Sequence, residues 1–515
     1  MASRRYLYFT VFMGGLTTLA VEFTASRMLQ TVYGTSNLVW ANVIGVVLAF
    51  LTLGYFLGGR IADKNPDASR FYVLVALAGF SSVFFLLLTS ALLKTGAAAM
   101  AQMNVGAIAG CLVGVLFALA IPVTLLGCLS PFAIRLAVRD VAEAGRISGR
   151  IYAVSTWGSI LGAYVPVLFV IPMAGSRLSA LIFGGLLLCV GIVGALQSRP
   201  RKAYAVLLLP LLLAPPSYAW AFGSLKNSPG QIFEKESAYN YIEIIRKDNC
   251  TYLYLNEGAG FHSLHCEDAD SQPQGVYTAL LVAPFMRTPT GTFPEVRRVA
   301  VVGLAAGTIS HLYDRFFHPA QIDGIELDPE IVDAGRRYFD MNEPNLNVII
   351  GDGRYELNRQ SGPYDVVVLD AYKVPYIPWH LTTAEFFEEI RSKLSDDGVV
   401  SLNVVALPND RRLVEAIAAT MRTVYPSVHV FNVPWSMNNI LVATVQETSQ
   451  ENLVANIAAL PEDTSSVLVD ALAAAAQNFI PGDEGGIVFR DERAPVESIV
   501  DSTLIRYLLT AMGMV

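Results

Sequence analysis

Long apolar runs dominate the first 222 residues and constrain the fold more than any other feature. Seven of them cover residues 6–29, 38–59, 71–93, 105–129, 152–175, 178–196 and 203–222. A helix needs roughly 20 mostly apolar residues to cross the hydrocarbon core of a bilayer. Buried core helices do not explain so many runs in series, and the first run is not a cleavable signal, because further runs follow it directly. We therefore predict a multi-pass α-helical membrane bundle with about seven spans over residues 1–222.

Composition excludes several other classes of protein. Only 16% of the 515 residues are charged and 53% are hydrophobic, which is too apolar for a disordered chain. The 44 acidic and 36 basic residues leave a net charge of -8, so no nucleic-acid partner is expected. The six histidines show no metal-ligand spacing, so no metal is expected. The lipid bilayer is the expected partner, and a homo-oligomer stays open.

Lysine and arginine predict the orientation of the bundle. They gather before the first run and between runs two and three, four and five, and six and seven. Cytoplasmic loops carry such an excess, so we expect a multi-pass protein of the cell (inner) membrane with a cytoplasmic N-terminus. With seven spans the C-terminal part faces outward. Pro210, Pro215 and Pro216 leave open a re-entrant last segment, which would return that part to the cytoplasm.

Two cysteines also bear on which side of the membrane the C-terminal part lies. Cys250 and Cys266 flank a predicted β-hairpin with strands near residues 252–256 and 261–264. Antiparallel pairing brings the two cysteines within disulfide reach, and a disulfide fits an oxidising compartment. Two unrelated thiols are an equal alternative.

The rest of the chain changes pattern at residue 276. Residues 231–268 alternate apolar with polar side chains, which predicts a small β-rich domain over residues 223–275. Beyond it, strands alternate with helices. This order predicts a Rossmann-like α/β domain with a doubly wound parallel sheet over residues 276–515.

Glycines and carboxylates follow four successive predicted strands. They are Gly303 and Gly307, then Glu326, then Asp352 with Gly353, and then Asp370. Ligands of such sheets bind outside the carboxyl ends of the strands. Glu326 suits a ribose diol and Asp352 an adenine amino group, so the spacing predicts a nucleoside-type ligand.

These motifs resemble the S-adenosylmethionine-binding polyamine aminopropyltransferases, the spermidine synthase family, and more narrowly its membrane-fused branch. The resemblance covers about residues 231–443. ESAYNYIEI and LYLNEG are similar to the family's N-terminal β-domain, and VVGLAAGT to its glycine turn. IDGIELDPEIVDAGRRYF, GDGRYEL and YDVVVLDAY follow in family order, and RDERAPVE resembles the fused class.

The resemblance implies that S-adenosylmethionine, or its decarboxylated form, is the substrate. It assigns Tyr239 and Tyr277 to the binding set beside the strand-end residues, and makes Asp370 the catalytic aspartate. The chemistry it implies is attack at the carbon next to the sulfonium, with 5′-methylthioadenosine leaving.

Three departures from the family remove carboxylates that bind amines, the first of which faces the aminopropyl amine. Ala306 replaces the aspartate of the glycine turn, Lys373 replaces the second aspartate of the D-x-x-D pair, and Ala279 replaces a carboxylate after Tyr277. A lysine repels a cationic amine by about 4 kcal/mol at about 4 Å in an effective dielectric of about 20. The family's conserved glutamine has no clear counterpart, and His262 or Ser263 could substitute for it.

These departures lead to the hypothesis that the chain cleaves S-adenosylmethionine itself. The substrate's own carboxylate would attack its γ-carbon and release homoserine lactone, with Asp370, Tyr372 and Lys373 orienting the aminoacyl tail. Aminopropyl transfer from decarboxylated S-adenosylmethionine to a polyamine is the alternative. A methyltransferase and a non-catalytic binding or transport protein are further alternatives. Trp379 and His380 could form a lid over the site or pack ordinarily.

Overall fold

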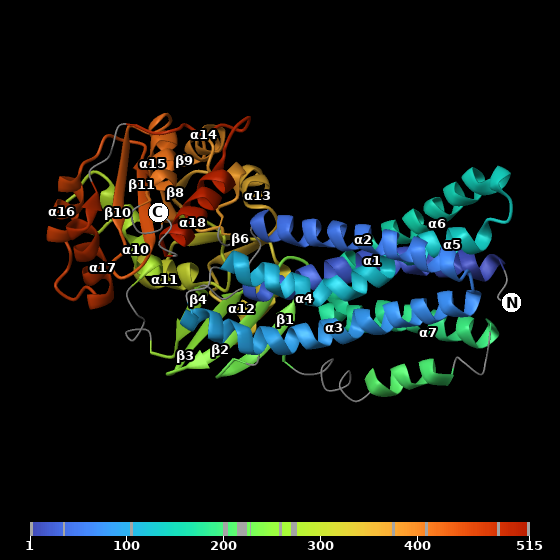
Figure 1. The fold of residues 1–515 in the computed structure, drawn as a ribbon. Helices are drawn as coiled ribbons and strands as arrows, with labels where there is room; N and C mark the ends of the chain where they lie inside the picture. Colours follow the sequence, from blue (N-terminus) through green and yellow to red (C-terminus); the bar gives the residue numbers. More distant parts are fainter. Residues whose placement is uncertain are drawn as a thin grey trace. The chain divides into compact units, whose positions relative to one another are not determined.

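The computed structural model describes residues 4–33, 37–103, 107–198, 204–213, 224–226, 228–256, 260–268, 275–372, 376–406, 410–480 and 485–511. Two compact units share the chain (Figure 1). The first is Met1–Glu243 with Leu255–Gly258, and the second is Ile244–Tyr254 with Ala259–Val515. The domain boundaries at residues 222 and 275 stay predictions.

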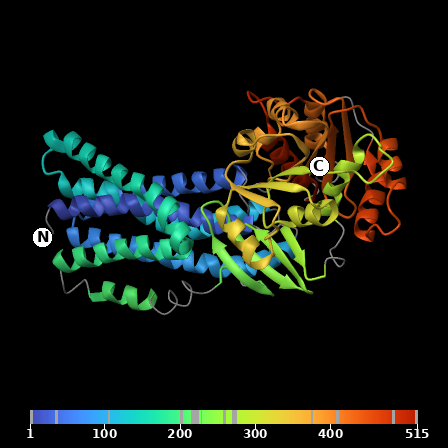
Figure 2. The same cartoon turned by 180° about the vertical axis from the view of Figure 1, so that it is seen from behind.

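Long helices make up most of the described part of the first unit (Figures 1 and 2). They are α1 (Arg4–Tyr33), α2 (Asn37–Lys64), α3 (Ala68–Met103), α4 (Ala107–Gly127), α5 (Leu129–Ala137), α6 (Ala144–Val165) and α7 (Ile171–Ser198), with a short π-helical segment η2 (Pro166–Val170) before α7. Five described segments are long and apolar enough to cross a membrane: Arg4–Thr31, Trp40–Lys64, Ala68–Thr89, Val113–Ala137 and Val141–Ser198.

The fifth of these segments contains two of the predicted spans. Val141–Ser198 is 58 residues long, and its backbone leaves helical geometry at Gly175, where φ is 80° and ψ is 165°. Half of the predicted run at residues 203–222 lies outside the described residues, which include 204–213. Five apolar helical segments are therefore established, and seven spans stay a prediction.

Glycines set the packing of α1 against α6. A Cβ added at Gly158 would lie 2.0 Å from the carbonyl oxygen of Phe12, and one at Gly162 would lie 2.1 Å from that of Leu16. Such contacts are forbidden for any larger residue. The two helix backbones can approach this closely only because these positions lack a side chain.

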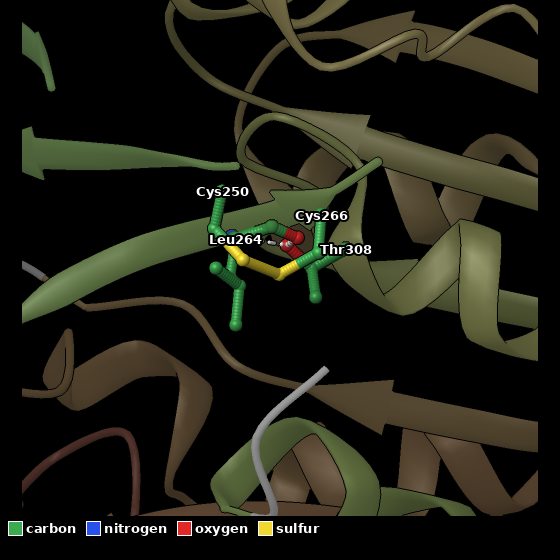
Figure 3. Close-up of a disulfide and its surroundings, with 4 residues drawn as sticks. All are labelled: Cys250, Leu264, Cys266 and Thr308. Atoms are coloured by element: carbon green, nitrogen blue, oxygen red, sulfur yellow. Dashed lines mark hydrogen bonds between the residues drawn. A yellow bond between two sulfur atoms is a disulfide. The ribbon is translucent and has the colours of Figure 1, made fainter. Parts of the chain in front are cut away.

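A four-stranded sheet follows the helices in the chain. Its strands are β1 (Gln231–Glu236), β2 (Tyr241–Lys247), β3 (Cys250–Leu255) and β4 (Phe261–Cys266), in that order. The predicted hairpin is confirmed, because β3 and β4 pair antiparallel with Cys250 opposite Cys266. A disulfide joins these two cysteines, which are therefore not unrelated thiols (Figure 3). That the four strands form a domain of their own stays a prediction.

The second unit is built on an eight-stranded sheet with the order β12-β10-β11-β9-β8-β5-β6-β7. Its strands are β5 (Arg298–Val302), β6 (Gln321–Glu326), β7 (Leu346–Ile350), β8 (Tyr364–Leu369), β9 (Leu394–Val405), β10 (Ser427–Asn432), β11 (Asn438–Thr444) and β12 (Phe479–Ile480). The predicted Rossmann-like parallel sheet is confirmed for β5 to β9. The pairs β9 with β11, β11 with β10 and β10 with β12 are antiparallel. The sequence analysis did not predict these antiparallel strands.

Helices cover both faces of this sheet (Figure 2). Val299 and Val301 of β5 belong to one core, with residues of α11 (Thr308–Phe317), α12 (Pro329–Tyr338), α16 (Gln450–Ala458) and α17 (Ser466–Gln477). Ala300 and Val302 belong to the opposite core, with α13 (Gly353–Arg359), α14 (Ala384–Arg391), α15 (Arg412–Arg422) and α18 (Val496–Ala511). Alternate residues of a strand point to opposite faces, so a strand buried on both faces reads as a continuous apolar run.

Candidate active site

The turn after β5 meets the turn after β8 at the switch point of the large sheet. The chain leaves β5 for β6 and β7 on one side and continues with β8 on the other, and ligands of open α/β sheets bind at such a point. Gly303 has a φ of +89°, and a Cβ there would lie 2.5 Å from the carbonyl oxygen of Asp370. Gly307 has a φ of +93°, and a Cβ there would lie 2.5 Å from Cγ of Met341. The positive φ favours glycine at both positions, and at Gly303 a close approach of the Asp370 backbone also excludes a side chain.

Glu326 ends β6 and holds the same turn. One carboxylate oxygen accepts a hydrogen bond from the N–H of Ala305 at 2.9 Å, and the other accepts from the N–H of Asp328 at 3.0 Å. Ala305 has a φ of 50°, which is uncommon for a residue other than glycine. The Glu326 side chain is buried, and burial raises its pKa to about 7. The carboxylate is therefore at the predicted strand end, and its negative charge is poorly solvated.

Asp352 and Gly353 follow β7. Asp352 caps helix α13 by accepting from the N–H of Tyr355 at 3.1 Å, and its other oxygen lies 3.2 Å from Nε2 of His380. A Cβ at Gly353 would lie 2.4 Å from Cγ1 of Val302. Asp352 thus has a structural role as a helix cap. His380, in the short helix η6 (Trp379–Leu381), reaches it, while a lid function stays a prediction.

Asp370 ends β8 and is the candidate catalytic base. Its Oδ1 accepts a hydrogen bond from Nδ2 of Asn403 at 2.9 Å. Burial raises the pKa of Asp370 to about 7. A carboxylate that titrates near neutrality can take a proton from an ammonium group and release it again.

Two predicted tyrosines lie within electrostatic reach of this carboxylate. Burial, and then the charge of Asp370, raise the pKa of Tyr277 and of Tyr372. The Tyr277 hydroxyl donates to the carbonyl oxygen of Phe261 at 3.2 Å. The Tyr372 hydroxyl donates to the carbonyl oxygen of Asn403 and accepts from a backbone N–H of β9, both at 2.9 Å. Backbone groups therefore fix both phenols beside Asp370.

Similarity to known proteins indicates the protein family of this domain. Residues 283–456 match the family model described as the spermine/spermidine synthase domain. The chain carries a spermine/spermidine synthase domain. The resemblance predicted from the motifs is thereby confirmed for this part of the sequence.

Relatives of the synthase domain align with about half of the chain. A polyamine aminopropyltransferase of Vibrio vulnificus is 27% identical over 256 residues, which cover 48% of this chain and 79% of that protein. A probable polyamine aminopropyl transferase of Bifidobacterium longum is 28% identical over 225 residues, which cover 43% of this chain and 46% of that protein. A crystal structure of a probable spermidine synthase from Corynebacterium glutamicum aligns with a TM-score of 0.38 and 18% identity, covering 50% of this chain and 97% of that one.

For two predicted site residues no position at the candidate site is established. Lys373 lies outside the described residues. Tyr239 belongs to the first unit, where its side chain is 47% exposed and its carbonyl oxygen accepts from the guanidinium group of Arg27 at 3.4 Å. Their roles toward a ligand stay predictions.

Contacts of some other residues near the glycine turn and Asp370 are shown only by the structure. Asn403 was not predicted as a site residue. The only indication in the sequence is that it is a polar amide within the apolar run GVVSLNVVAL. Ser263, a suggested stand-in for the family's glutamine, accepts from the N–H of Ala306 at 2.9 Å. Burial lowers the pKa of His262, the other suggested stand-in, to about 4. Over the described ranges, no group of three or more His, Cys, Asp and Glu side chains is arranged to hold a metal.

Proposed function

We propose that the synthase domain binds an S-adenosyl sulfonium compound and transfers the carbon chain beside the sulfonium to an amine. The observation that carries the proposal is Asp370, a carboxylate with a pKa near neutrality at the switch point of a sheet. It stands against the glycine turn in a domain whose relatives are named polyamine aminopropyltransferases.

The proposed step balances as a displacement at carbon. The amine nitrogen attacks the carbon next to the sulfonium and forms a C–N bond. The C–S bond breaks with its electron pair going to sulfur, and neutral 5′-methylthioadenosine leaves. The amine loses its proton to Asp370. The sulfonium is already an activated leaving group, so the protein mainly contributes position and charge complementarity.

A second candidate is cleavage of S-adenosylmethionine without an acceptor. Ala306 is 0% exposed and Ala279 is 8% exposed. The family resemblance expects a carboxylate that faces the aminopropyl amine at the first position and a further amine-binding carboxylate at the second. Two small apolar residues cannot hold an ammonium group there. In this candidate the substrate's carboxylate attacks its own γ-carbon, and homoserine lactone leaves with methylthioadenosine.

One set of incubations separates the candidates. Full-length protein in detergent is given S-adenosylmethionine alone, or decarboxylated S-adenosylmethionine with and without putrescine. Methylthioadenosine that requires both decarboxylated donor and putrescine supports transfer. Methylthioadenosine from S-adenosylmethionine alone supports cleavage, and S-adenosylhomocysteine with a methylated amine points to a methyltransferase. No product in any arm, together with no adenosyl binding, refutes an adenosyl-dependent enzyme.

We also propose that the first 222 residues cross the membrane seven times, with Val141–Ser198 crossing twice around Gly175. The number of crossings decides where the synthase domain lies. An odd number with a cytoplasmic N-terminus places it outside, and the Cys250–Cys266 disulfide fits that side. A C-terminal fusion to a reporter that is active on only one side tests this, and activity restricted to the cytoplasm would show an even number.

A further inference from the structure

Strand β4 is attached to the start of helix α11 through one threonine hydroxyl. Oγ1 of Thr308 accepts from the N–H of Leu264 at 2.7 Å and donates to the carbonyl oxygen of Leu264 at 2.9 Å (Figure 3). Both residues are 2% exposed. The hydroxyl therefore satisfies both backbone groups of one strand residue, as a neighbouring strand would. Thr308 is also the first residue of α11, directly after Gly307.

The residue before Leu264 holds the glycine turn itself. Oγ of Ser263 accepts from the N–H of Ala306 at 2.9 Å, while Glu326 bonds the preceding N–H, that of Ala305. Two successive amides of the turn thus have side-chain partners from two different elements. Ala305 is left-handed at a φ of 50°, and a non-glycine residue keeps such a conformation only where its surroundings over-determine it.

The disulfide fixes the strand that carries these contacts. Cys266 lies two residues after Leu264 and is joined to Cys250 on β3. In the four-stranded sheet β4 is an end strand, with β3 as its strand neighbour. An end strand is held by hydrogen bonds to only one neighbouring strand, whereas a central strand is held on both sides. The disulfide to β3 therefore restricts the movement of β4 more than it would restrict that of a central strand.

We propose that the Cys250–Cys266 disulfide, Thr308 and Ser263 form a brace that keeps the Gly303–Gly307 turn in its ligand-binding conformation. Ser263 is a positioning residue in this proposal, because it acts through the turn. The inference rests on the proposed function, since it takes an adenosyl compound as the ligand of the turn. Loss of the brace weakens adenosyl binding and raises KM, and it leaves kcat within about twofold because Asp370 and its Asn403 bond are untouched.

The test measures binding of 5′-methylthioadenosine to the full-length protein in detergent by calorimetry. Ser263→Ala and Thr308→Val are each expected to weaken binding about five- to tenfold, the equivalent of one buried hydrogen bond. Ser427→Ala is the matched control, because Ser427 also accepts from a backbone N–H, that of Thr448, at 2.9 Å. It should bind like the wild type.

Reduction tests the disulfide without a substitution. Dithiothreitol supplies the two electrons and two protons that convert the disulfide to two thiols. It should weaken binding by the wild type and leave the double variant Cys250→Ser, Cys266→Ser, already weakened, unchanged. If Ser263→Ala does not fold, the reduced wild type still decides the matter.

The outcomes separate this proposal from the proposed function. Wild-type protein that binds no methylthioadenosine refutes the function, and the brace with it. Wild-type protein that binds it equally well when reduced, or that loses nothing with Ser263→Ala, refutes the brace and leaves the function standing.

Discussion

Asp370→Asn is expected to stabilise the fold while removing activity. Burial raises the pKa of Asp370 to about 7, whereas an exposed aspartate titrates near about 4. The folded state therefore binds this proton more tightly than the unfolded state, and stability from this group is lost as pH rises from about 4 to about 7. A difference of about three pKa units corresponds to about 4 kcal/mol above pH 7 and to nothing below about pH 4.

Asparagine keeps the shape of the side chain and the bond from Asn403 but carries no charge. The assay is thermal unfolding of the full-length protein in detergent at about pH 5 and about pH 8. The Tm of the variant should exceed that of the wild type by more at the higher pH, and the variant should release no methylthioadenosine. Asp463→Asn, at an exposed position, is the control and should change neither. An equal Tm difference at both pH values, or an active Asp370→Asn, would refute the reasoning.

Three further results are expected. Asn403→Leu removes the hydrogen bond that lowers the pKa of Asp370, so the acid limb of the pH–rate profile should move up by about one unit; an unchanged limb contradicts the role of Asn403. Near neutral pH, S-adenosylmethionine should release protons from Asp370 and Glu326 on binding, because its sulfonium favours both carboxylates in their charged form, whereas neutral methylthioadenosine should release none. Calorimetry in two buffers of different ionisation enthalpy measures this, and equal release by both compounds contradicts it. Gly158→Ala places a methyl group 2.0 Å from a carbonyl oxygen of α1 and should prevent assembly of the bundle, seen as loss of the monodisperse peak in size exclusion. Gly185→Ala, which meets no atom within 4 Å, should behave as wild type, and a normal Gly158→Ala peak would contradict the close packing.

The sequence predicted those parts of the fold that depend on local patterns. Strands β5 and β8 are mostly apolar and are followed directly by Gly303 and Asp370, and β6 ends in Glu326, so both their type and their order could be predicted. Strands β10 and β12 could not, because most of their residues are only partly buried, and their pairing depends on residues far away in the chain.

Polar contacts between residues far apart in the chain could not be predicted from the sequence either. The segment RDERAPVE was assigned only by resemblance or as a surface loop. In the structure its Asp491 accepts from the guanidinium group of Arg354 at 2.7 Å, and the same guanidinium group binds Glu389. The hydrogen bond from Arg354 lowers the pKa of Asp491. A pair separated by 137 residues leaves no local pattern, so the strand-end carboxylates could be predicted and their partners could not.

The charges of the site favour a cationic ligand. In the part of the chain that the structure describes, neither Glu326 nor Asp370 has an ion pair with a lysine or arginine, and burial raises the pKa of both to about 7. Poorly solvated carboxylates of this kind destabilise a fold and are typical of functional sites. A sulfonium cannot lose its charge by deprotonation, so it complements the two carboxylates whenever they are ionised, and its binding favours their ionised form.

Complementarity to the substrate alone does not accelerate a reaction. In the proposed transfer the positive charge moves from sulfur to the attacking nitrogen as the C–S bond breaks. A carboxylate near the ribose holds substrate and transition state about equally, whereas one near the nitrogen attracts the charge that develops there. The difference in role between Glu326 and Asp370 therefore follows from their positions on the sheet, since the pKa of each is raised to about 7.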